Sequence, residues 1–346
     1  MHPAGPHPDK NIVLAFSSSG GRFPIHLGIA DWIESELVAD GWVIAARIGT
    51  SGGAFAAVTR SRGIGSREWF EIAVPVGHHA HIGPSKKWRH AWNMLMYGGV
   101  LRSSSLISNS RDGLFVQGGG WTEEGQPAGT PCYTVAWSIT SNTEVVFPVD
   151  LGNVAEVVVA SSSIPGVISP TEIRNGDLSP EIQRKLRVED HPEEFSAFVD
   201  GAVSTPVPID TAFDLPEVKD LIDQGRQVAV LGISLDPAEV RYRPDGLVGS
   251  ALSGGVFYKK ILSGCFAALK SATVEDMEDA MDVGTCAMLN VSTGPFSEYA
   301  AKFDVTVEEA ATMWQYGFDC AQDLCSIGWG ANGSLTLLEH LDTLVG

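Results

Sequence analysis

One serine in this sequence has the neighbours that a catalytic nucleophile requires. Ser51 is the centre of Gly49-Thr50-Ser51-Gly52-Gly53, the only G-x-S-x-G in the chain. The apolar run Trp42–Ile48 precedes it and the small-residue run Ala54–Val58 follows, which predicts a buried strand, a tight turn and a helix. Such a turn holds the serine Oγ clear of the backbone, and its glycines avoid a clash between a Cβ and the neighbouring strand or helix. The alternative is an ordinary Gly/Ser turn before a helix.

An aspartate much further along the chain lies where a strand is expected to end. Asp200 ends the apolar run Phe195–Val199 and precedes Gly201. A carboxylate can take the proton of a serine hydroxyl directly as the serine attacks an acyl carbonyl. Ser51 and Asp200 are 149 positions apart, so only the fold can bring them together. The carboxyl end of a strand is where open α/β sheets build sites; the alternative is a turn aspartate in an Asp-Gly pair.

A Ser-His-Asp triad is the competing arrangement. A conventional α/β-hydrolase places several strands before its nucleophile, whereas only two are expected before Ser51. His340 lies in an amphipathic C-terminal segment, where a solvent-facing or core histidine is the simpler interpretation. The histidines after Ser51 are His78, His79, His81, His90, His191 and His340.

A glycine turn near the N-terminus could hold an oxyanion. Gly20 and Gly21 follow the apolar run Asn11–Phe16 and precede a helical pattern over Ile25–Val38. Their backbone N–H groups can therefore point at a developing negative charge, with a helix N-terminus behind them. A phosphate-binding turn is the alternative, but the complete G-x-G-x-x-G and the G-K-[ST] ending are missing.

Two strand–turn–helix units in succession predict an α/β fold with a central, mostly parallel sheet flanked by helices. Further strands are expected at Tyr133–Ile139, Val145–Phe147, Glu156–Ala160, Phe195–Val199, Gln227–Ser234 and Cys286–Val291. Helices are expected at Leu247–Ala272, Val307–Ser326 and Leu335–Leu344. We expect a tail over residues 1–10 and one domain over 11–346, with helical or loop insertions near 63–130 and 171–194.

Charge is distributed unevenly along the 346 residues. Lysine and arginine number 23 against 42 aspartates and glutamates, a net charge of −19 that argues against nucleic acid as the main partner. Residues 1–170 carry 11 basic and 13 acidic groups, and residues 171–346 carry 12 and 29. If this division persists in space, the less charged part can approach lipid. Five cysteines without a C-x-x-C pair, and no apolar leader, favour a reduced, cytoplasmic setting.

An aromatic, basic segment is a candidate for lipid contact. Within Ser85–Tyr97, Trp88, Trp92 and Leu95 share one helical face with a basic border, as in helices that lie at membrane interfaces. We therefore expect a lid or lipid-docking element; the alternative is a helix packed on the core.

Two segments rich in metal-ligating side chains are not expected to bind metal. Adjacent histidines such as those in His78–His81 rarely converge on one ion, and no carboxylate with supporting spacing is near. The acidic segment Glu275–Asp282 lacks the glycine and the ligand spacing of an EF-hand loop.

Four segments occur in order along the chain: Leu14–Gly28, Gly49–Gly53, Ala160–Pro170 and Phe198–Val207. Together they resemble the conserved motifs of the patatin-like phospholipases, a family of lipid acyl hydrolases, and the resemblance runs from about Asn11 to Ser326. It implies a three-layer fold related to the α/β-hydrolases. It also implies cleavage of acyl esters of lipids, of phospholipase A type or a related esterase, with no cofactor.

The resemblance also assigns roles to residues. It makes Ser51 and Asp200 a catalytic dyad that works through an acyl-enzyme, and it gives Gly20, Gly21 and Arg22 to the oxyanion loop. Gly49, Gly52, Gly53, Gly201 and Pro165 match supporting positions of the motifs. The implied partner is a lipid or phospholipid, with transient contact at a membrane surface.

The first motif departs from the family pattern. Ser18 and Ser19 replace two glycines of the usual run of three, and Phe23 replaces a later glycine. Ala202 and Thr205 are milder departures. Backbone donors can survive these changes, and a catalytically weak or inactive lipid-binding relative remains the alternative function.

Overall fold

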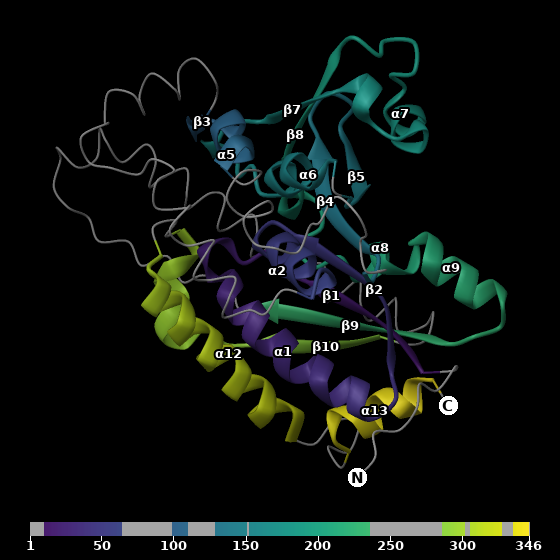
Figure 1. The fold of residues 1–346 in the computed structure, drawn as a ribbon, viewed down its shortest axis with the longest axis vertical. Helices are drawn as coiled ribbons and strands as arrows, with labels where there is room; N and C mark the ends of the chain where they lie inside the picture. The colour runs from purple at the N-terminus through teal and green to yellow at the C-terminus, as the bar shows by residue number, and fades with distance from the viewer. Residues whose placement is uncertain are drawn as a thin grey trace, which may run out of the picture.

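An eight-stranded sheet forms the centre of the computed structural model (Figure 1), which describes residues 10–63, 99–109, 129–150, 152–235, 286–301, 305–326 and 335–345. The strand order is β10-β9-β1-β2-β4-β8-β7, with β5 paired to β4. The strands are β1 (Asn11–Phe16), β2 (Val43–Thr50), β4 (Cys132–Ser138), β5 (Thr143–Pro148), β7 (Thr171–Arg174), β8 (Phe195–Asp200), β9 (Val228–Leu235) and β10 (Cys286–Val291). A separate parallel pair joins β3 (Gly99–Leu101) and β6 (Gly166–Ile168).

The larger part of this sheet is parallel. β10, β9, β1, β2 and β4 pair in parallel, while β5, β8 and β7 are antiparallel to their neighbours. All six residues of β1 are buried, as expected for a parallel strand covered on both faces. The predicted α/β class with a central, mostly parallel sheet flanked by helices is confirmed.

Helices cover both faces of the sheet. On one face, Ile12, Leu14 and Phe16 of β1 share a core with α1 (Phe23–Ala39), α2 (Gly52–Ser61), α6 (Val154–Ser161), α12 (Val307–Ser326) and α13 (Leu337–Leu344). On the other face, Val13 and Ala15 pack with α8 (Ile209–Phe213) and α9 (Pro216–Asp223). Among the described residues the other helices are α5 (Ser103–Asn109), α7 (Pro180–Leu186) and the 3-10 helices η1 (Gly20–Arg22), η4 (Asn175–Asp177), η5 (Gly201–Val203) and η7 (Gly294–Ala301).

A bulge in β2 changes which side chains face α1. The pairing with β1 runs from Ile12↔Ile44 directly to Val13↔Ala46, so one residue of β2 is skipped. Ile44 therefore packs in the α1 core, whereas Ala46 and Ile48 pack in the core beneath α8 and α9. Arg47 is directed toward α1 as a consequence.

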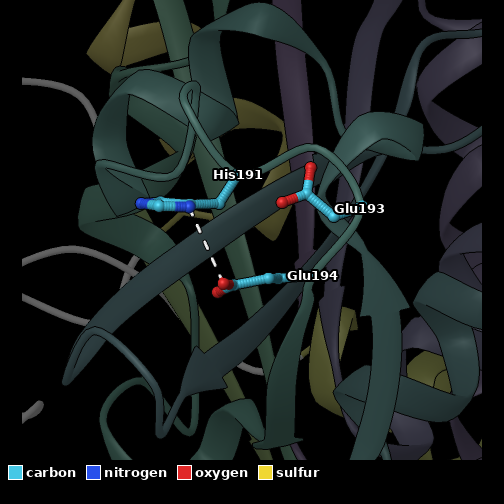
Figure 2. Close-up of side chains that lie close together, drawn as sticks. All are labelled: His191, Glu193 and Glu194. Atoms are coloured by element: carbon cyan, nitrogen blue, oxygen red, sulfur yellow. Dashed lines mark ion pairs between the residues drawn. The ribbon is translucent and has the colours of Figure 1, made fainter.

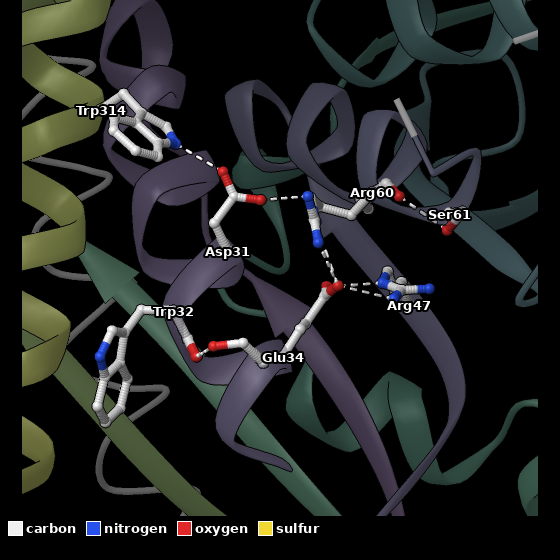
Figure 3. A network of polar contacts seen from close by, with 9 residues as sticks. Asp31, Trp32, Glu34, Arg47, Arg60, Ser61 and Trp314 are labelled. Carbon is white, nitrogen blue, oxygen red and sulfur yellow. Dashed lines mark hydrogen bonds and ion pairs between the residues drawn. The ribbon is translucent and has the colours of Figure 1, made fainter. Parts of the chain in front are cut away.

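Arg47 belongs to a buried polar network on that face (Figure 3). Its Nε and Nη2 donate to the two carboxylate oxygens of Glu34 on α1, at 2.9 and 3.0 Å. Arg60 of α2 also donates to Glu34 and to Asp31, and Asp31 accepts from Trp314 Nε1 of α12 at 2.6 Å. These contacts tie β2, α1, α2 and α12 together around the segment that carries Ser51.

The helices α1 and α12 cross at two glycines. A Cβ added to Gly28 would overlap the carbonyl oxygen of Trp314, and one added to Gly317 would overlap that of Ile25. The two backbones therefore approach each other closely, and only glycine fits at either position. Within the part of the chain that the structure describes, no helix is long and apolar enough to cross a bilayer.

The structure corrects two predictions of local structure. Residues 156–160, predicted as a strand, lie in the helix α6, which starts after a turn in which Asp150 accepts from the N–H groups of Gly152 and Asn153. The segment 171–194, predicted as a helical or loop insertion, contains the helix α7 but also the strand β7, which pairs with β8 at the edge of the central sheet. The exposed residues of both elements are charged except for Pro180, which made the segment resemble a loop.

The other predicted strands are confirmed to within two residues, and so are the helices at 307–326 and 335–344. Several predictions lie outside the described residues. They are the tail over residues 1–9, most of the insertion near 63–130, the Trp segment Ser85–Tyr97, the histidines His78–His90, the helix Leu247–Ala272 and the acidic segment Glu275–Asp282.

Candidate active site

Two strands that run in opposite directions bring Ser51 and Asp200 together. β5 occupies one edge of β4, so β2 and β8 share the other edge. β2 ends where Thr50 pairs with Val135, and β8 ends at the next position, where Asp200 pairs with Ala136. The strand ends therefore meet, and Ser51 Oγ donates a hydrogen bond to Asp200 Oδ2 at 2.6 Å.

This placement differs from the one that the sequence suggested. The carboxyl ends of parallel strands lie at one edge of a sheet, but β8 is antiparallel to β4. Its carboxyl end reaches Ser51 because its pairing with β4 covers only three residues, Ala136–Ser138. The positions at which β2 and β8 pair along β4 therefore bring Ser51 and Asp200 together, although the two strands are not parallel.

The turn at Ser51 is strained and tightly packed. Ser51 has φ 56° and ψ −123°, a conformation that side-chain-bearing residues rarely adopt and that costs about 1–3 kcal/mol. A Cβ on Gly49 would overlap the backbone of Gly53, and a Cβ on Gly53 would overlap the carbonyl oxygens of Phe16 and Ser17. The clash expected from the sequence is therefore present, between the turn and both the helix α2 and the strand β1.

A side chain without an assigned role holds the backbone of this turn. The N–H of Ser51 donates to Ser161 Oγ at 2.9 Å, and Ser161 Oγ donates to the carbonyl of Val135 at 2.6 Å. Ser161 is the last residue of α6 and is fully buried. The sequence gives Ser161 only as part of a motif-like segment, because a serine that binds backbone groups leaves no local pattern.

Burial controls the ionisation of Asp200. The residue is 1% exposed, and burial raises the pKa of its carboxyl group to about 7, against the opposing effect of hydrogen bonds from Ser51 Oγ and Ala202 N–H. Ala202 N–H donates to Oδ1 at 2.9 Å, which leaves Oδ2 to Ser51. A base whose pKa lies near neutrality can both accept and return a proton under ordinary conditions.

The loop after Asp200 is fixed from several sides. A Cβ on Gly201 would overlap the carbonyl oxygen of Val135, so the loop presses against β4. Thr50 Oγ1 donates to Thr205 O at 2.9 Å, and Ser18 N–H donates to Pro206 O at 2.8 Å. The loop therefore links the end of β2 with the glycine turn near the N-terminus.

That glycine turn packs directly on the nucleophile turn. Gly20 has φ 58°, and a Cβ on Gly52 would lie 2.6 Å from its carbonyl oxygen and 3.0 Å from its nitrogen. Gly20 and Gly21 form η1, which leads into α1. Backbone N–H groups at the start of a helix have no partner within it, so this end of α1 can accept negative charge.

Two buried side chains support the glycine turn. Arg22 is 3% exposed; its Nε donates to Ser19 O at 3.2 Å and its Nη1 to Thr293 Oγ1 at 2.8 Å. His26 Nε2 lies 2.9 Å from Ser17 O, and its ring packs edge-on against Phe16. Arg22 thus connects the glycine turn to the segment after β10, so its position is that of a residue that stabilises the turn.

Pro165 and His340 are two further described residues for which the sequence suggested a role. Pro165 is in the turn between α6 and β6. His340 is on α13, a helix whose Asp342 pairs with Lys10 just before β1, whereas Ser51 follows the carboxyl end of β2. The length of a six-residue strand, about 20 Å, therefore separates the ends of the sheet that carry His340 and Ser51. The structure does not bring His340 to Ser51, as a Ser-His-Asp triad would require.

One group of potential metal ligands is present among the described residues (Figure 2). His191, Glu193 and Glu194 lie in the loop between α7 and β8, and His191 Nδ1 is 3.6 Å from Glu194 Oε1. All three are exposed, and Asp200 is at the far end of β8. The group is a surface ion pair with a neighbouring carboxylate.

No family model and no curated protein sequence matches this chain. Among solved structures it is similar to VipD from Legionella pneumophila, with 11% identity and a TM-score of 0.37, over 92% of this chain and 66% of that one. It is also similar to the type III effector protein ExoU, with 12% identity and a TM-score of 0.36, over 99% of this chain and 54% of that one. The chain thus spans less than two thirds of either length.

Proposed function

We propose that this protein is a serine hydrolase that cleaves acyl esters of lipids through Ser51 and Asp200. The observation that carries the proposal is the 2.6 Å hydrogen bond from Ser51 Oγ, on a strained strand-to-helix turn, to a buried carboxylate oxygen of Asp200. Strained backbone is typical of functional sites. A nucleophile in hydrogen-bond contact with its base is the signature of covalent catalysis.

The reaction proceeds in two halves. Asp200 Oδ2 takes the proton of Ser51 Oγ while the oxygen attacks the acyl carbonyl carbon, and the N–H groups of Gly20 and Gly21 hold the resulting oxyanion. When the intermediate collapses, Asp200 returns the proton to the leaving alcohol and the acyl group stays on Ser51. Asp200 then takes a proton from water, which attacks the acyl-enzyme, and Ser51 recovers its proton as the fatty acid leaves.

The lipid class of the substrate is supported by the four motifs that resemble the patatin-like hydrolases. The geometry supports the ester chemistry. These two supports are independent, so a test with a short soluble ester examines the dyad without any requirement for a lipid surface.

Removing either member of the dyad tests the chemistry. Ser51→Ala and Asp200→Asn are each expected to lower hydrolysis of a short p-nitrophenyl ester by about 10⁴-fold or more, because the residues act as one unit. A fluorophosphonate probe is expected to label wild type and not Ser51→Ala.

Asp214→Asn is the matched control, because Asp214 is an exposed aspartate paired with Lys219. It is expected to keep wild-type turnover. Full activity of purified Ser51→Ala or Asp200→Asn would disprove the dyad, and a wild-type protein that the probe does not label would favour a non-catalytic lipid-binding protein.

A further inference from the structure

We propose that Ser161 is a positioning residue of this site, whose hydroxyl keeps Ser51 in the strained backbone conformation that directs Oγ at Asp200. This inference rests on the proposed function and adds to it a residue that does not touch the substrate. Its basis is the hydrogen bond from Ser51 N–H to Ser161 Oγ, at 2.9 Å.

The conformation of Ser51 requires a support from outside the turn. At φ 56° and ψ −123°, the backbone of Ser51 has a strained conformation that persists only when contacts with the surrounding structure hold it. The packing of Gly49 and Gly53 constrains the residues on either side. Within the turn, the carbonyl of Ser51 accepts a hydrogen bond from Ala54 N–H at 2.9 Å. From outside the turn, Ser161 Oγ binds the backbone N–H of Ser51, the group whose direction relative to the side chain is set by φ.

The hydroxyl of Ser161 is held in place at its other side. It donates to the carbonyl of Val135 at 2.6 Å, so it accepts one hydrogen bond and donates another, and Ser161 is fully buried. Val135 pairs with Thr50, the residue before Ser51, and its carbonyl oxygen is the atom against which Gly201 packs. The carbonyl of Val135 therefore contacts both Ser161, which binds Ser51 after β2, and Gly201, which follows Asp200 at the end of β8.

The same turn of chain also holds Asp200. Two residues after Ser161, the carbonyl of Ser163 accepts a hydrogen bond from Asp200 N–H at 3.0 Å. The end of α6 thus binds the backbone N–H of both dyad residues, through a side chain in one case and through a carbonyl in the other. The residues at and just after the C-terminus of α6 therefore contact both the nucleophile and the base.

Loss of the Ser161 hydroxyl has a defined consequence. The N–H of Ser51 loses its acceptor in a buried place, and the turn gains freedom to relax toward an ordinary conformation that moves Oγ away from Asp200. Misplacement of a reacting group on the scale of 1 Å lowers rate by up to about 100-fold. Substrate binding is unaffected, so KM is expected to remain at its wild-type value. The hydrogen bond from Ser51 Oγ lowers the pKa of Asp200, so its loss is expected to move the midpoint of the pH profile upward.

The test compares Ser161→Ala with Ser138→Ala in the full chain. Ser138 is also a fully buried serine, and its Oγ also accepts a backbone N–H, that of Ser141 at 3.2 Å. This hydroxyl binds the turn after β4, while the backbone of Ser138 pairs with Phe198, two residues before Asp200. Both variants are measured for unfolding in urea, for kcat and KM on a short p-nitrophenyl ester from pH 5 to 9, and for the rate of fluorophosphonate labelling. Ser161→Ala is expected to lower kcat and the labelling rate by about tenfold to 100-fold, and Ser138→Ala to leave both unchanged.

Three results would overturn the inference: wild-type kcat in Ser161→Ala, an equal loss of kcat in Ser138→Ala, or a pH midpoint that moves to lower pH. If Ser161→Ala does not fold, Ser161→Cys preserves the volume with a much weaker hydrogen-bonding group and carries the same expectation. A failure of the proposed function is distinguishable, because wild type itself would then neither hydrolyse the ester nor react with the probe.

Discussion

At the scale of residues, the ionisation of the Asp200 carboxyl group determines whether it can accept the proton of Ser51 Oγ. The carboxyl group is 1% exposed and accepts hydrogen bonds from Ser51 Oγ and Ala202 N–H. Burial disfavours its charged form and has the largest influence, so the pKa rises from 3.8 to about 7. A carboxylate of higher pKa is a stronger base, and Asp200 is therefore suited to remove the serine proton without help from a histidine.

This pKa predicts the pH dependence of turnover. The base must be ionised to accept the proton, so kcat/KM is expected to increase with pH, to reach half its maximum near pH 7 and to fall about tenfold per unit well below it. The measurement is hydrolysis of a short p-nitrophenyl ester by wild type from pH 5 to 9, with the spontaneous rate subtracted. A midpoint near the ordinary value for aspartate, or a flat profile, would contradict the role of Asp200 as base.

At the scale of elements, the crossing of α1 and α12 sets the position of the glycine turn. α1 begins immediately after Gly20–Arg22, and α12 packs along it at Gly28 and Gly317. The network of Asp31 and Trp314 adds a polar contact to the same interface. A displacement of α1 would therefore move the N–H groups that are proposed to bind the oxyanion.

Gly28→Ala is expected to destabilise the protein by about 1–3 kcal/mol, because the added Cβ overlaps the Trp314 carbonyl. Helix propensity alone acts in the opposite direction, since alanine is favoured over glycine in a helix by about 1 kcal/mol. The measurement is unfolding in urea. Thr312→Ala, at an exposed site on α12, is the control and is expected to change stability by about 0.5 kcal/mol or less. A stabilised Gly28→Ala variant would show that the helices can separate without cost.

The elements differ in how well local sequence predicts them, for physical reasons. β1 and β10 have their predicted bounds because each is a mostly apolar run that ends before a serine. α6 was predicted as a strand because its valines are buried on most sides, which removes the helical period on which the distinction depends. The charged residues of β7 alternate with buried ones over only four positions, too few for a clear pattern.

The features of the site also differ in whether local sequence predicts them. The strained turn at Ser51 and the glycines around it follow from local sequence, because each clash involves adjacent elements. The contact between Ser51 and Asp200 depends on where β2 and β8 end along β4, a register that no local pattern specifies. The contribution of Ser161 depends on that register too, since it binds Val135 at the junction.

At the scale of the whole molecule, the two halves of the chain are interleaved. β9 and β10, from the acidic half, pair next to β1, and α12 packs on α1. The difference in charge between residues 1–170 and 171–346 therefore does not divide the described molecule into a near-neutral part and an acidic part. The net charge of −19 is therefore expected to repel an anionic lipid surface from the molecule as a whole.

This charge predicts how salt affects action on lipid. Wild type is expected to release fatty acid faster from zwitterionic phosphatidylcholine vesicles than from vesicles with 30% anionic lipid, about tenfold faster at low salt. The difference is expected to shrink at roughly 0.5 M NaCl, where the screening length falls to a few ångströms. Ser51→Ala on the same vesicles is the control for release that does not depend on the nucleophile.

The reverse salt dependence would have a specific meaning. If the basic segment Ser85–Tyr97 docks on lipid through Trp88 and Trp92, attraction dominates locally, and hydrolysis of anionic vesicles is faster at low salt and falls as salt is added. Trp88→Ala combined with Trp92→Ala would then reduce vesicle hydrolysis and leave the soluble ester unaffected. Because the soluble ester needs no surface, the ratio of the two activities separates docking from catalysis in every variant.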